Sequence, residues 1–67
     1  MSHTLNTPPD VPVGTLKLLG PLGLKYEVGQ PVSPLDDGDW LVEIILVETG
    51  SKVVYRYSSL MADRDAG

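Results

Sequence analysis

The densest group of side chains that could do chemistry is a short acidic loop, Asp36-Asp37-Gly38-Asp39. Clustered carboxylates suit calcium, but the known calcium-binding loop spreads its ligands more widely, closes with a glutamate and lies between helices. Here the cluster is short, lies between strand-like segments and contains residues typical of turns. We therefore expect a polar hairpin loop without a metal, and retain Asp36, Asp37 and Asp39 as an alternative contact surface for a partner.

The groups that usually cooperate in catalysis are missing. A serine or threonine nucleophile needs a base within reach, yet the only histidine is His3, in a polar N-terminal stretch. Zinc sites are built mainly from cysteine and histidine, and the chain has no cysteine. Glu27, Glu43 and Glu48 fall on the outward sides of expected strands, in water, where carboxylates keep ordinary pKa values. We expect no enzyme, no metal and no other cofactor.

Aromatic and basic side chains offer a second kind of chemistry. The aromatic residues are Tyr26, Trp40, Tyr55 and Tyr57, and the basic residues near them are Lys17, Lys25, Lys52 and Arg56. Small β barrels bind single-stranded nucleic acid by stacking bases on such rings. The alternation of the strands instead directs the rings inward, where they would pack in a core. The net charge of −4 also opposes binding to phosphates.

Short strands and tight turns must position all of these residues. Residues 15–19 indicate a short strand, and Gly20-Pro21-Leu22-Gly23 after them has the composition of a tight turn. Residues 24–28 alternate between apolar and charged side chains, as a half-buried strand does. The glycine and prolines that follow are expected to end this strand.

Residues 40–48 carry the strongest strand pattern and are expected to open a hairpin. A two-residue turn at Gly50-Ser51 would return the chain along residues 52–57. This register places Leu46 opposite Tyr55 and Ile44 opposite Tyr57. Ser58 is then expected to cap a short helical turn through residue 62.

These elements predict a mostly β chain, a four- to five-stranded antiparallel meander with a short C-terminal helical turn. We expect it to close as an SH3-like barrel or half-barrel, with a two-layer open sheet as the alternative. The proline-rich residues 1–12 are expected to form a disordered tail, residues 13–62 a single small β domain, and residues 63–67 a frayed C-terminus.

The central strand is apolar on both sides, which leaves a second apolar face once the first makes the core. Its members are Leu41, Ile45, Val47 and Val54. An exposed, β-prone apolar face needs cover. We expect a homodimer or a protein partner to supply it at these four residues.

Composition limits the other partners and the location. No stretch approaches the length of a membrane span, and the first residues lack the basic and apolar regions of a signal peptide. The absence of cysteine is compatible with a reducing compartment. We therefore expect a cytoplasmic protein that binds neither membrane nor nucleic acid.

Several segments resemble a family of short uncharacterised bacterial proteins. They are the Gly-x-x-Gly-x-x-Tyr-Glu-Val run of residues 20–28, the strand that begins at Trp40, the Glu-Thr-Gly turn of residues 48–50, and Tyr55. The resemblance implies a bacterial or phage origin and a compact single domain, and supplies no activity.

With the apolar face and the acidic surface, these features favour a non-enzymatic protein-binding module, of the inhibitor or antitoxin kind. The alternative is a small barrel that binds single-stranded nucleic acid.

Overall fold

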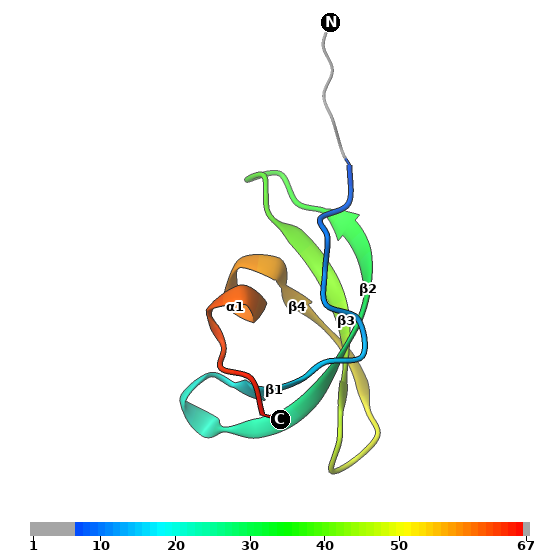
Figure 1. Ribbon diagram of the computed structural model, residues 1–67. Coiled ribbons are helices and arrows are strands. Elements are labelled where there is room, and N and C mark those ends of the chain that lie inside the picture. Colours follow the sequence, from blue (N-terminus) through cyan, green and yellow to red (C-terminus); the bar gives the residue numbers. More distant parts are fainter. Residues whose placement is uncertain (1–6, 67) are drawn as a thin grey trace, which may run out of the picture.

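The structure, a computed structural model, describes residues 7–66, so His3 and the first half of the predicted tail lie outside the described residues. Four strands form one antiparallel sheet in the order β1-β2-β3-β4 (Figure 1). They are β1 (Leu16–Leu19), β2 (Leu24–Pro34), β3 (Trp40–Leu46) and β4 (Lys52–Arg56), joined by the 3-10 helix η1 (Gly20–Leu22) and followed by the helix α1 (Tyr57–Ala62). The predicted antiparallel meander with a short C-terminal helix is confirmed.

The sheet is open, because β1 and β4 lie at opposite ends of the strand order in the described part of the chain. Residues 64–66 run along the free side of β1. The Leu18 N–H donates to the Arg64 carbonyl at 2.9 Å, and the Ala66 N–H donates to the Leu16 carbonyl at 2.8 Å. Where the sequence led us to expect fraying, these long-range hydrogen bonds hold the C-terminal segment against the sheet.

Strand β2 does not end at Val28, as its glycine and prolines had suggested, but continues to Pro34. Its pairing with β3 shifts twice, between Val28 and Pro31 and again before Ser33, which are the marks of β-bulges. Prolines are tolerated at bulges and on edge strands. The expected end of the strand was therefore wrong.

The first bulge depends on Gly29, because a Cβ atom there would lie 2.7 Å from the backbone oxygen of Glu43. Only a residue without a side chain permits this close approach of the two strands.

The hairpin of β3 and β4 forms, but its predicted register was wrong. Tyr55 lies opposite Val42 instead of Leu46, a shift of four residues along β3 (from 46 to 42). The Gly50 N–H bonds to the Leu46 carbonyl at 2.7 Å, and Gly50 has a φ of +74°, so the loop is longer than the expected two-residue turn. Tyr57 begins α1 instead of ending β4. Since the shift is even, every β4 side chain keeps its predicted face.

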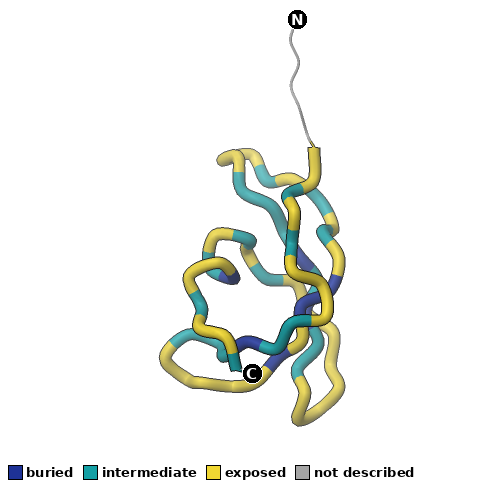
Figure 2. The backbone as a smooth tube through the Cα atoms, viewed as in Figure 1, coloured by how far each residue is buried: buried dark blue, intermediate teal, exposed yellow. Residues whose placement is uncertain are grey.

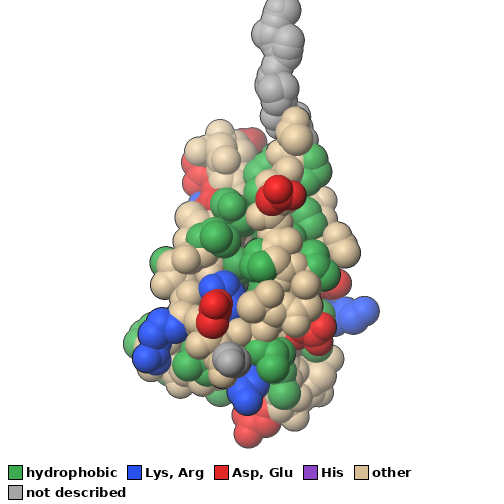
Figure 3. Space-filling view, in the orientation of Figure 1, with side chains coloured by type: hydrophobic (Ala, Val, Ile, Leu, Met, Phe, Trp, Pro, Cys, Tyr) green, Lys and Arg blue, Asp and Glu red, His purple; other side chains and the backbone are tan. Residues whose placement is uncertain are grey.

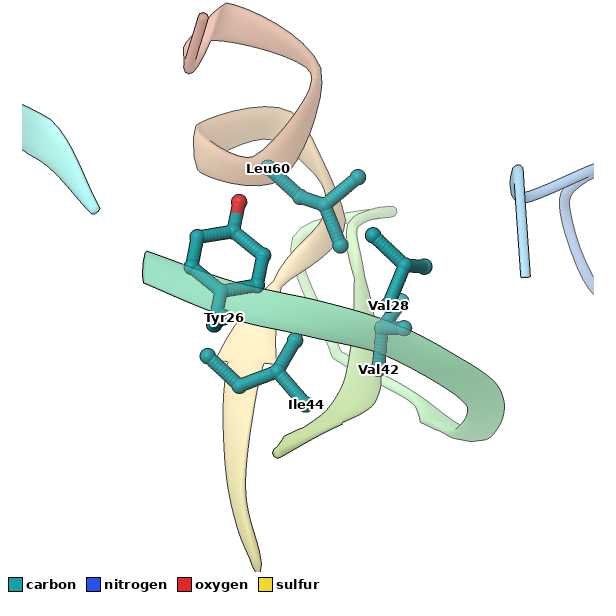
Figure 4. Close-up of a cluster of buried hydrophobic side chains, with 5 residues drawn as sticks. All are labelled: Tyr26, Val28, Val42, Ile44 and Leu60. Atoms are coloured by element: carbon teal, nitrogen blue, oxygen red, sulfur yellow. The ribbon is translucent and has the colours of Figure 1, made fainter. Parts of the chain in front are cut away.

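The core lies between the sheet and α1, on what we call the inner face. Its fully buried side chains are Tyr26, Val28, Val42, Ile44 and Leu60. In Figure 2 the buried stretches of the backbone, coloured dark blue, lie on the strands and on α1. Leu60 points from α1 toward the four residues on β2 and β3 (Figure 4). Val11, in the predicted tail, is half-buried and packs against this cluster. The inner face is thus covered from two sides.

Candidate functional site

The side of the sheet that points away from α1, the outer face, follows from the strand register. Tyr26 and Val28 are buried on the inner face, so Glu27 between them points outward. Residues paired across the strands share a face. The apolar members of the outer face are Leu16 and Leu18 on β1, Leu41 and Ile45 on β3, Val47 after β3, and Val54 on β4.

All four residues predicted to contact a partner lie on this outer face. Val47 and Val54 are 50% and 53% exposed, while Leu41 and Ile45 are half-buried. The two segments that cover the sheet, α1 through Leu60 and the N-terminal stretch through Val11, both pack on the inner face. The register therefore brings the predicted residues together on the side where these segments do not lie.

Leu16 and Leu18 are members of the outer face that the sequence did not identify. Both are half-buried, and they pair with Glu27 and Lys25 of β2. No sequence signal identified them, because a charged residue is expected to point outward. Lys17, which lies between them, is instead on the inner face and only 5% exposed. Its ammonium is accommodated by the carbonyl of Asp63 at 2.8 Å and the carboxylate of Asp65 at 3.1 Å.

Charged side chains of both signs separate the apolar residues of the outer face. Lys25 and Glu27 project from β2, Glu43 from β3, and Lys52 and Arg56 from β4. The outer face is therefore a mixed apolar and charged surface, whereas the buried members of the inner face are apolar except for Lys17.

A hollow of about 330 Å³ lies at the end of the sheet, between the start of β2 and the β3–β4 turn. Its apolar lining comes from Leu24, Leu46 and Val47, and its charged lining from Lys25 and Glu48. Val47 thus belongs both to the outer face and to this hollow. The hollow is large enough to accept apolar side chains of a partner, with a charge of either sign beside it.

The acidic loop is held by contacts within the chain. Arg56 donates to Asp37 at 2.7 Å and to Asp39 at 3.3 Å. Asp39 also accepts the Ser58 hydroxyl at 2.6 Å and the Ser58 backbone N–H at 3.1 Å, so it caps the first turn of α1 from a distant part of the chain.

These contacts change how the acidic loop titrates. The hydrogen bond from Arg56 lowers the pKa of Asp37, and the hydrogen bond from Ser58 lowers the pKa of Asp39. Both carboxylates are thereby kept ionised and engaged inside the chain. Asp36 is also exposed, and no hydrogen bond or ion pair among the described residues holds its side chain.

A second polar network, centred on Asp63, lies under α1 on the inner face. One oxygen of Asp63 accepts the hydroxyls of Tyr26 at 2.8 Å and Tyr55 at 2.9 Å, and the other accepts the Gly20 N–H at 2.9 Å. Burial, reinforced by the bond to Asp63, raises the pKa of the Tyr26 hydroxyl above its ordinary value. The network joins β2, β4, η1 and the C-terminal segment, and its proton donors are all in use.

The aromatic residues give little surface for stacking. Tyr26 is fully buried and packs edge-to-face on Tyr55, with ring centroids 5.7 Å apart. Trp40, Tyr55 and Tyr57 are half-buried. The inward orientation expected from strand alternation is confirmed for Tyr26.

Fold and site together define a small antiparallel β protein whose sheet is packed on one face and presents an apolar and charged surface on the other. The chain belongs to a family of unknown function, DUF5397, whose family model matches residues 4–67. An uncharacterized protein of Haemophilus influenzae is 43% identical over 56 residues, which are 84% of this chain and 89% of that protein. The resemblance to a family of short uncharacterised bacterial proteins is confirmed.

Among the described residues, neither helix has the length or the apolar composition needed to cross a membrane.

Proposed function

We propose that this chain is a non-enzymatic module that binds a larger protein through its outer face. The observation that carries the proposal is Val47, which is half exposed and lies where the outer face meets the 330 Å³ hollow. Interfaces gain most of their affinity where a few apolar side chains enter such pockets and exclude water. The partner is expected to insert an apolar side chain beside Val47 and to lie across Ile45 and Val54.

The charge of the chain indicates how such a module would act. A net charge of −4 favours a partner with a basic site. The chain would then work by occupying that site, as an inhibitor or antitoxin-like protein does, in the cytoplasm of a bacterium. The nucleic-acid alternative receives no support from Tyr26, whose ring is buried and whose hydroxyl is bound to Asp63.

Variants that introduce a negative charge on one or the other side of the molecule test this proposal. Val47→Glu and Val54→Glu place a carboxylate on the outer face, and Met61→Glu makes the same change at a residue of α1 that is also 50% exposed. Each tagged variant would be compared with the wild type in affinity capture from the bacterium that encodes it, after circular dichroism has confirmed folding.

We expect the wild type and Met61→Glu to retain the same partner, and the two outer-face variants to lose it. Equal retention by all four proteins would contradict the proposal. A partner released by ribonuclease or deoxyribonuclease treatment would favour the nucleic-acid alternative.

A further inference from the structure

The outer edge of β4 offers unpaired backbone hydrogen-bonding groups. The Leu46 N–H bonds to the Ser51 carbonyl, and antiparallel bonding alternates along the ladder, so Val53 and Tyr55 bond to β3. The N–H and carbonyl groups of Lys52 and Val54 therefore point away from the sheet. In residues 7–66, no turn, loop or cap hydrogen bond of the backbone uses them. A strand edge of this kind is a template for another strand.

The side chains of the same strand are also uncovered. Val53, on the inner face, is 42% exposed, and Val54, on the outer face, is 53% exposed. A strand added at this edge would place side chains beside both valines, one on each face of the sheet, and would cover both of them.

A second copy of β4 can supply that strand, and charge selects how it aligns. A two-fold axis through Lys52 would set Lys52 opposite itself. An axis through Val54 would set Lys52 opposite Arg56 of the second copy. Like charges directly opposite each other destabilise a strand pair.

An axis through Val53 avoids both conflicts. It places Lys52 opposite Val54 of the second copy, in the same cross-strand row as Glu43 of that copy, since Glu43 pairs with Val54. The two Lys52 side chains then become diagonal neighbours, each with a carboxylate in its row.

We propose that two copies of this chain pair through antiparallel β4 edges about a two-fold axis at Val53. The outward N–H and carbonyl groups of Lys52 and Val54 would bond to those of Val54 and Lys52 in the other copy. The two sheets would become one continuous sheet, with both outer faces on the same side. Such a contact is self-complementary, as a two-fold interface requires.

This interface shares Val54 with the partner surface proposed above, but it uses the backbone edge of β4 and leaves Val47 and the hollow beside it free. On the face of the molecule seen in Figure 3, hydrophobic side chains are interrupted by charged side chains and by other polar and backbone atoms.

Single-cysteine variants test the register directly, because the native chain contains no cysteine. The two Val53 residues would form a pair without hydrogen bonds between them, with Cα atoms about 4.5 Å apart, which a disulfide can span. The two Val54 residues would lie on neighbouring strands and two residues apart along them. Their Cα atoms would therefore be about 8 Å apart, which is too far for a disulfide.

The variants Val53→Cys, Val54→Cys and Met61→Cys would be oxidised with glutathione at high micromolar concentration and followed by non-reducing electrophoresis. Circular dichroism checks that each folds, and sedimentation of the wild type gives its oligomeric state independently.

We expect Val53→Cys to form a disulfide dimer roughly tenfold or more faster than Met61→Cys, which reports random collision. Val54→Cys should match the collision control. Faster cross-linking of Val54→Cys than of Val53→Cys would overturn the register. Equal rates for all three variants, with a monomeric wild type, would overturn the dimer, whether or not the outer face binds another protein.

Discussion

The inner and outer faces of this sheet have comparable apolar side chains and very different surroundings. On the inner face, α1 contributes Leu60 to the core, and Asp63 gathers the hydroxyls of Tyr26 and Tyr55. On the outer face, Val54 is half exposed and charged residues stand between its apolar neighbours. Apolar alternation alone therefore does not decide which face becomes the core. The difference comes from α1 and from the N-terminal stretch at Val11, which both pack on the inner face only.

The largest expected effect is at the residue through which α1 covers the inner face. Leu60→Ala should lower the free energy of unfolding by about 2–5 kcal/mol, because it leaves a cavity against four buried side chains. Urea denaturation measures this loss. Met61→Ala, on the exposed side of the same helix, should change it by less than about 0.5 kcal/mol. Similar losses for both would mean that α1 does not pack as described.

The next effect concerns the polar network of the inner face. Asp63→Ala removes the acceptor of two tyrosine hydroxyls and should cost about 1–3 kcal/mol for each buried group left unpaired. Tyr55→Phe should cost less in the Asp63→Ala background than in the wild type, because the partner of its hydroxyl is already gone. Additive losses in this double-mutant cycle would show that the two residues act independently.

A smaller effect should appear in acid, at the exposed cluster that caps α1. The pKa of Asp39 is lowered by its hydrogen bond from Ser58, so the stability it contributes is present above the unfolded pKa of about 4 and is lost as pH falls through the lower folded pKa. Thermal unfolding from neutral pH to about pH 2 should show a shallower acid decline for Asp39→Asn than for the wild type. Asp36→Asn should follow the wild type, since no hydrogen bond among the described residues holds the Asp36 side chain. Identical slopes for Asp39→Asn and the wild type would contradict the proposed cap.

The smallest effect is expected on the outer face. It is tested by making the same substitution, Val to Thr, once on each face of the sheet. Val54→Thr should change the free energy of unfolding by less than about 0.5 kcal/mol, because its side chain is half exposed. Val42→Thr buries a hydroxyl in the core and should cost about 1–3 kcal/mol. Chemical denaturation of the two variants measures the difference between the two faces. Equal losses of unfolding free energy in Val54→Thr and Val42→Thr would show that the outer face is packed like a core.

The fold class could be predicted because its signals are local. Alternation in residues 24–28 and 40–46 identifies strands and their faces, and an even error in register leaves those faces unchanged. The register itself failed because Gly50 suits both a two-residue turn and the longer loop that Leu46 and Gly50 close.

The missed parts depend on contacts between distant residues. Nothing near Asp63 in sequence indicates that its carboxylate meets Tyr26 and Tyr55, or that Lys17 is buried beneath it. The first β-bulge of β2, between Val28 and Pro31, depends on the close approach of Gly29 to Glu43 in the neighbouring strand. By contrast, Leu41, Ile45, Val47 and Val54 could be grouped from parity alone, and their role as a partner surface stays a prediction.

The most direct test of the outer face as a contact surface is photo-cross-linking in the bacterium that encodes the protein. A photoreactive phenylalanine derivative would replace Val47 beside the hollow in one strain and Met61 on α1 in another, two positions of equal exposure. Light should attach a second, larger protein to the Val47 variant and leave the Met61 variant unmodified. Adducts at Met61 without adducts at Val47, or no adduct at either position, would contradict the assignment of the outer face.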